Sequence, residues 1–175
     1  GAIRYIILGI TPPTMFRHSL YVFVAFLTSC IAFALAALMA VKFKKNKEFF
    51  MDVVNFFDAI GLGVFAVTGT NTAIVSGFAH NPFLAIFVGV ITGIGGGMLR
   101  DILAGRVPFV LYKDVYASAA IVGASLYYVL YINGANVAVS VSLTIIITIL
   151  IRLAASFYHL SLPRIPKISI KDEDE

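Results

Sequence analysis

The sequence contains one cysteine, Cys30, and no tryptophan, and only 13% of its residues are charged. A chain with one cysteine cannot form an internal disulfide, and no cysteines and histidines are spaced like a zinc or iron–sulfur site. The sequence also lacks a Walker loop, an HExxH motif and a grouped Ser, His and Asp set. It therefore predicts neither an enzyme nor a protein that holds a metal or an organic cofactor. A soluble domain would carry about a quarter charged residues, so this chain has too little polar surface to face water.

Apolar residues make up 60% of the 175 residues, and the mean hydropathy is +0.96. Crossing a bilayer takes about 20 apolar residues in a helix, whereas barrel strands alternate over about ten residues. The long apolar runs here are continuous, so the sequence predicts an all-α membrane protein with the lipid bilayer as its surroundings. The five runs expected to span are 19–41, 53–76, 83–104, 115–132 and 137–157. Residues 1–8 form an apolar piece that is too short to span.

The charged residues indicate the orientation of these segments. Four lysines follow the run 19–41, two basic residues follow the run 83–104, and three basic residues lie in 164–171. All three regions fall on one side if each long run spans once. The positive-inside rule then predicts a multi-pass plasma-membrane protein with a cytoplasmic C-terminal tail. We therefore read the net charge of +4 as a topology signal and expect no nucleic-acid partner.

The sequence also contains an internal repeat. Residues 1–9 match 97–105, a proline follows each copy, and 15–21 match 110–116. The period of about 95 residues is long enough for three membrane helices. Because three is odd, the second copy must enter the membrane from the opposite side, which is the inverted repeat found in many transport proteins. A duplication with no role in transport is the alternative.

The repeat predicts a domain organisation. Residues 1–45 would be the remainder of a first three-helix repeat and 46–132 a second repeat. Residues 133–160 would hold a seventh helix, and 161–175 a disordered cytoplasmic tail. The second copy has about 40 residues before residue 97 that the first copy lacks. We therefore expect a first helix and part of a second to precede residue 1.

Three consecutive glycines, Gly95, Gly96 and Gly97, lie within the apolar run 83–104. Each glycine costs a helix about 1 kcal/mol relative to alanine. The run therefore predicts a weakened or broken helix whose carbonyl groups, with the nearby Thr92 hydroxyl, are open to an ion or to water. The alternative is close helix packing through small residues.

Charged and polar residues lie in or beside the same membrane segments. Arg100 and Asp101 follow the glycines by one turn, and they either face a functional path or anchor the helix at the interface. Asp58 could face a pore, pair with an arginine or cap its helix. Thr68 belongs to a polar patch that could line a water path or bond to a neighbouring helix. Lys113 begins the next segment and could be a simple interface residue.

Two of these stretches resemble a known family. Residues 58–69 (DAIGLGVFAVTG) and 93–101 (GIGGGMLRD), followed by Gly105 and Pro108, resemble prokaryotic members of the trimeric intracellular cation channel (TRIC) family. Such sequences are also grouped as glycine-transporter-domain or uncharacterised membrane proteins. The resemblance implies a seven-helix subunit with inverted three-helix repeats, assembled as a homotrimer. It also implies one pore in each subunit and potassium as the main permeant ion.

Together the residues and the resemblance predict a monovalent cation channel. A secondary transporter of a small solute such as glycine is the first alternative, and a structural membrane protein is the second. The repeat keeps an arginine at position 4 but has Tyr5 where the second copy has Asp101. The candidate ion-path residues are Gly1, Arg4, Asp58, Thr68, Thr92, Gly95, Gly96, Gly97, Arg100, Asp101 and Lys113.

Overall fold

A computed structural model of the chain describes residues 2–13, 19–42, 47–105, 107–108, 110 and 114–157. The extended regular elements within these residues are helical, which confirms the prediction of an all-α protein. Their order is α1 (Ala2–Ile7), α3 (Ser19–Lys42), α4 (Lys47–Ala73), η1 (Ile74–Phe78), α5 (Pro82–Leu103), α6 (Asp114–Ile132) and α7 (Val137–Phe157). The predicted boundary at residues 45 and 46 and the predicted tail 161–175 lie outside the described residues.

Three helical stretches within the described part of the chain are long and apolar enough to cross a membrane. They are Asn55–Phe78, Pro82–Leu103 and Val137–Ser156, with mean hydropathies of 1.4, 1.9 and 2.4. Val22–Ala32 and Tyr116–Ile132 are shorter apolar stretches. At 1.5 Å per residue, the 22 residues of α5 extend about 33 Å, close to the thickness of the hydrocarbon core.

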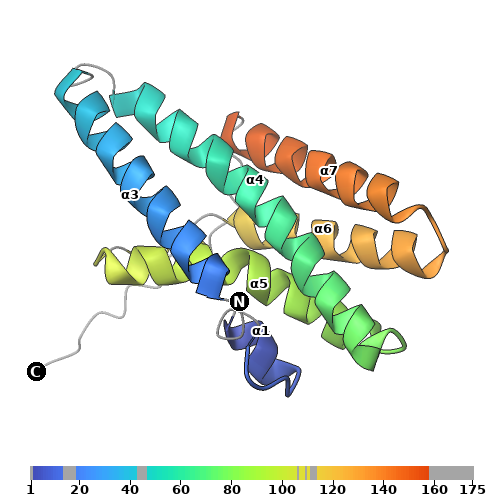
Figure 1. Cartoon of the computed structure of the whole chain (residues 1–175). Helices are drawn as coiled ribbons and strands as arrows, with labels where there is room; N and C mark the ends of the chain where they lie inside the picture. Colours follow the sequence, from blue (N-terminus) through green and yellow to red (C-terminus); the bar gives the residue numbers. More distant parts are fainter. Residues whose placement is uncertain are drawn as a thin grey trace, which may run out of the picture.

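Helices α4, α5, α6 and α7 pack together, and α4 contacts the other three (Figure 1). The short helix α1 packs against α5. Helix α3 is not among the closely packed helix pairs of the described residues. Several of its large apolar side chains are exposed, including Phe23, Phe26 and Ile31. The bundle α4–α7 is therefore the part of the structure that can position a site.

Local sequence signals fix where the bundle helices begin. Asn81 caps α5, because its side-chain oxygen accepts a hydrogen bond from the Leu84 N–H at 3.0 Å, and Pro82 occupies the first turn. Asn136 accepts a hydrogen bond from the Ala138 N–H at 2.9 Å, beside the start of α7. The turn between α6 and α7 contains Gly134 with φ +72°, a conformation that favours glycine.

The two copies of the repeat end their helices in the same way. In α1 the Leu8 N–H donates to the Arg4 carbonyl at 3.1 Å, and Gly9 follows with φ +67°. In α5 the Ala104 N–H donates to the Arg100 carbonyl at 3.0 Å, and Gly105 follows with φ +65°. This shared backbone geometry supports the correspondence between residues 1–9 and 97–105.

The glycine run does not break α5. The helix continues without interruption through Gly95, Gly96 and Gly97 to Leu103, so the predicted break is wrong for this structure. The physical reason is that a backbone group without a hydrogen bond is expensive away from water, and this cost exceeds the weak helix propensity of glycine. The irregular backbone lies elsewhere, in the π-helical turn η1, where Gly77 has φ +96°.

Candidate functional site

Four charged side chains from three helices meet in one cluster. Asp58 comes from α4, Arg100 and Asp101 come from α5, and Arg152 comes from α7. Arg100 Nη1 lies 3.2 Å from Asp58 Oδ1, and Arg100 Nε lies 3.0 Å from Asp101 Oδ1. Arg152 Nη2 approaches the other oxygen of Asp58, Oδ2, at 3.4 Å. We call these four residues the charge cluster.

The members of the charge cluster differ in exposure. The side chains of Asp58, Asp101 and Arg152 are 13%, 6% and 6% exposed, whereas that of Arg100 is 46% exposed. Unpaired charges are very costly in a membrane protein, and buried charges are found paired. The two carboxylates and two guanidinium groups cancel in formal charge, so the cluster neutralises itself. Arg100 is the member that the surroundings can reach.

Tyr116 on α6 completes the cluster from a fourth helix. Its ring lies beneath the Arg152 guanidinium, with 4.4 Å from Cζ to the ring centroid. The Tyr116 hydroxyl and Asp58 Oδ1 both lie within 4 Å of the position that a Cβ atom would take at Gly97. A Cβ atom at Gly97 would lie only 2.8 Å from this hydroxyl. Gly97 therefore permits the close approach of Tyr116, which favours the packing interpretation for this one glycine.

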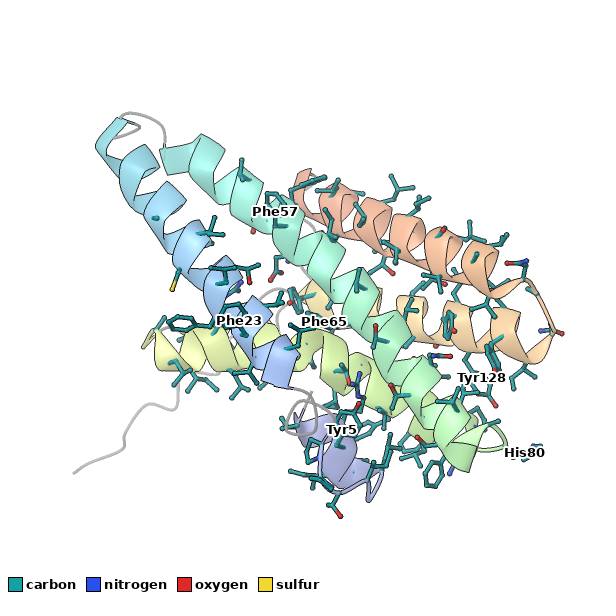
Figure 2. The ribbon with its side chains drawn as sticks, in the orientation of Figure 1. Tyr5, Phe23, Phe57, Phe65, His80 and Tyr128 are labelled. Atoms are coloured by element: carbon teal, nitrogen blue, oxygen red, sulfur yellow. The ribbon has the colours of Figure 1, made fainter. Side chains whose placement is uncertain are left out.

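A cavity of about 400 Å³ lies beside the charge cluster. Asp58 and Arg100 are its charged lining residues, while Phe57 and Phe65 of α4 contribute aromatic side chains (Figure 2). The remaining lining residues are Val53, Gly61, Leu62, Gly93, Gly96, Gly97 and Tyr116. The cavity is thus lined mainly by apolar residues and glycines, and its charged pair is Arg100 and Asp58.

The structure brings a subset of the predicted ion-path residues together. Asp58, Gly96, Gly97 and Arg100 line the cavity. Asp101 is buried behind Arg100 and bonded to it. Of the three interpretations left open for Asp58, pairing with an arginine is the one observed, and it leaves the carboxylate facing the cavity as well.

Three predicted residues lie away from the cavity lining. The Thr68 hydroxyl donates to the carbonyl four residues earlier at 2.7 Å, and its side chain is exposed. The Thr92 hydroxyl does the same at 2.6 Å, and it is buried against Gly69 in the contact between α4 and α5. Gly95 has open space where a Cβ would be. Among the described residues, the hydrogen bonds of Thr68 and Thr92 stay within their own helices and do not reach the charge cluster.

Arg4, the repeat counterpart of Arg100, is also away from the cavity. Its guanidinium lies over the ring of Tyr5, with 4.8 Å from Cζ to the ring centroid, on the short helix α1 (Figure 2). Its buried Nε has no hydrogen-bond partner among the described residues. Gly1 and Lys113 lie outside the described residues. Within the described part of the chain, no three His, Cys, Asp or Glu side chains gather as a metal site requires.

Arg152 and Tyr116 are members of the site that the sequence interpretation missed. Arg152 lies near the predicted cytoplasmic end of its helix, where an arginine reads as an interface residue. A signal was nevertheless present, because polar residues recur at every fourth position of α7 and so share one helix face. This face is buried in the structure and consists of Ser140, Thr144, Thr148 and Arg152.

Comparisons with known protein sequences agree on the kind of protein. A family described as "Glycine transporter" matches residues 55–132. A UPF0126 membrane protein of Vibrio cholerae is 34% identical over 163 residues, which cover 93% of this chain and 64% of the relative. The UPF0126 inner membrane protein YadS of Escherichia coli is 40% identical over 107 residues, which cover 61% and 51%. The chain therefore spans between half and two thirds of the length of these relatives.

Solved structures give the more specific likeness. One describes conductance through TRIC cation channels; it has a TM-score of 0.77 and 33% identity, and the match covers 94% of this chain and 76% of that one. The trimeric intracellular cation channel orthologue from Rhodobacter sphaeroides has a TM-score of 0.73 and 31% identity, covering 91% and 77%. A prokaryotic TRIC channel in 0.5 M KCl has a TM-score of 0.74 and 28% identity, covering 93% and 77%. With most of both chains aligned at these identities, the chain is a membrane protein of the TRIC channel family.

Proposed function

We propose that this protein is a monovalent cation channel that conducts mainly potassium, with one pore in each subunit of a homotrimer. We place it in the plasma membrane with its C-terminal tail in the cytoplasm. The observation that carries the proposal is the position of the Arg100–Asp58 pair on the wall of a cavity, within a bundle of mainly apolar helices. Charges in membrane segments are rare and mark ion pathways.

The charge cluster suits the passage of a cation better than its tight retention. A cation in the cavity meets the Asp58 carboxylate, but the Arg100 guanidinium already occupies the position 3.2 Å from it. Conduction requires sites that attract an ion weakly enough for it to leave. Because the formal charges of the cluster cancel, the site presents a low electrostatic barrier and no strong trap.

Arg100 is the member of the cluster that could regulate this barrier. It is 46% exposed and bonds to carboxylates on two helices, α4 and α5. If its guanidinium turns away from Asp58, the carboxylate becomes available to a permeating cation. We therefore assign to Arg100 the role of a tethered positive charge that competes with the ion.

The likeness to solved structures supports the same function. The aligned structures are cation channels, and one of them was determined in 0.5 M KCl. The proposed trimer is supported by these structures, because one of them is named as a trimeric intracellular cation channel.

A carrier of glycine is the second candidate, and the family match over residues 55–132 favours it by its description. The site offers a physical basis as well. A zwitterion needs a cation for its carboxylate and an anion for its ammonium group, and Arg100 and Asp58 supply both on one cavity wall.

The test is ion and solute flux through the full-length protein in liposomes, compared with the Arg100→Ala variant. We expect voltage-driven potassium flux that the variant alters, and no uptake of labelled glycine. Saturable glycine counterflow without potassium current would contradict the channel and support the carrier. If neither potassium flux nor glycine uptake is observed, the protein is a membrane protein without a transport role.

A further inference from the structure

Arg152 is a buried charge that lies behind the cavity wall. It is buried and belongs to α7, outside the two predicted three-helix repeats. Its guanidinium contacts Asp58 Oδ2 and the Tyr116 ring, and its buried Nε has no partner among the described residues. It is not among the residues that line the cavity.

The distances join the four residues of the charge cluster in one chain of contacts. Arg100 lies closer to Asp101, at 3.0 Å, than to Asp58, at 3.2 Å. Asp58 keeps its second oxygen for Arg152. Asp58 thus contacts two cations, the accessible Arg100 at 3.2 Å and the buried Arg152 at 3.4 Å. Asp58 lines the cavity, and Arg152 balances its charge from inside the bundle.

Resting on the proposed function, we infer that Arg152 is a positioning residue that sets how strongly the ion path prefers cations over anions. Its guanidinium offsets the charge of Asp58 and packs over the Tyr116 ring. Without Arg152 the cluster carries a net charge of −1 beside the cavity. Arg100 remains 3.2 Å from Asp58, so one cation then faces the two carboxylates of the cluster.

The net charges of the variants distinguish this electrostatic role of Arg152 from a purely structural one. The wild-type cluster has a net charge of zero, Arg152→Gln gives −1, Asp58→Asn gives +1, and the double variant returns to zero. One unit charge a few ångströms from an ion changes its free energy enough for an effect of about two- to tenfold on the permeability ratio. Loss of packing alone would not produce opposite signs in the two single variants.

The experiment measures the reversal potential of the full-length protein in planar bilayers with a KCl gradient. We expect Arg152→Gln to raise the potassium-to-chloride permeability ratio about two- to tenfold and Asp58→Asn to lower it. The double variant should return toward the wild-type ratio. Arg152→Lys, which keeps the charge, should restore most of the wild-type value. Ser142→Ala, an exposed position on the same helix, is the matched control and should change nothing.

The inference would be overturned if both single variants changed the permeability ratio in the same direction. It would also be overturned if the double variant differed from the wild type as much as Arg152→Gln does. If Arg152→Gln does not fold, Asp58→Asn is compared with the double variant. The inference then requires the double variant to be more cation-selective than Asp58→Asn. If the wild-type protein passes no current, the proposed function fails by itself. Thermal unfolding of the wild type, the variants Arg152→Gln and Asp58→Asn, and the double variant in detergent then tests the contact between the two residues. Additive losses of stability at 58 and 152 would refute it.

Discussion

Asp58 holds each carboxylate oxygen against a different arginine. Arg100 reaches it from α5 on the cavity side, and Arg152 reaches it from α7 inside the bundle. A buried carboxylate with two cationic partners is well compensated, and removing either partner leaves a costly uncompensated charge. Substitutions at the two arginines should differ in effect, because only Arg100 is accessible to an ion.

Replacing Arg100 with glutamine should raise the unitary potassium conductance. The change removes the positive charge nearest the cavity and leaves Asp58 and Asp101 in place, so the electrostatic barrier to a cation falls. We expect an effect of about two- to tenfold in single-channel recordings. Arg100→Lys is the control, because it keeps the charge and should remain close to the wild type. If the conductance of Arg100→Gln is unchanged, Arg100 does not lie on the ion path.

Gly97→Ala should destabilise the protein, and Gly95→Ala should not. The new methyl group at 97 would lie 2.8 Å from the Tyr116 hydroxyl, whose ring is held beneath Arg152. We expect a loss of about 1–2 kcal/mol, as for an overpacked interior. At 95 there is open space and the backbone is helical, so alanine should be neutral or stabilise by about 0.5–1 kcal/mol. Thermal unfolding in detergent distinguishes the two, and equal effects would contradict this account.

At the residue scale, sequence patterns found part of the site. Asp58, Arg100 and Asp101 could be singled out because charges are scarce in the apolar runs. The sequence could not decide among pairing, capping and pore lining for Asp58, since that depends on which helix faces it. Arg152 was missed because its partners lie 94 and 36 residues away in sequence, at Asp58 and Tyr116.

At the scale of helices, α4 and α5 are joined by a seam of small residues. A Cβ atom at Gly89 would collide with the Thr70 hydroxyl and lie 2.9 Å from the Ala66 carbonyl oxygen. A Cβ atom at Gly69 would lie 2.8 Å from Thr92. Helices in membranes associate through such close contacts between small residues. The seam holds Asp58 and Arg100 in register, because these residues belong to the two joined helices.

Gly89→Ala should therefore weaken the protein more than any alanine placed in the glycine run. The collision is with backbone and with a buried side chain, neither of which can move without separating α4 from α5. We expect a loss of about 2–3 kcal/mol or failure to assemble, measured by thermal unfolding in detergent. Gly96→Ala is the control, because nothing lies within 4 Å of its Cβ position. A Gly89→Ala protein as stable as the control would show that the seam is not tight.

The helices themselves were largely predictable from the sequence. The expected runs 83–104, 115–132 and 137–157 agree with α5, α6 and α7 to within one residue at each end. Length, apolar continuity and flanking Asn, Gly and Pro residues were enough for this. The state of the backbone inside a helix was not predictable in the same way. The triple glycine stays helical, and the irregular turn falls at η1, because hydrogen bonding and neighbouring helices outweigh local propensity.

At the scale of the whole molecule, α3 presents apolar side chains that no other helix of the described residues covers closely. Lipid or another protein surface must face them in a membrane. On the proposed function we expect a homotrimer. Light scattering of the detergent-solubilised full-length protein should give the mass of three subunits, and Ser142→Ala should give the same. A single-subunit mass at all protein concentrations would contradict the trimer.

The central claim is that the Arg100–Asp58 pair lies on the path of a permeating cation. It is tested most directly by single-channel recording of the full-length protein in potassium chloride, with Arg100→Gln beside the wild type. We predict unitary, cation-selective currents in the wild type and a larger potassium conductance in the variant. Saturable transport without unitary currents, or currents identical in both proteins, would contradict it.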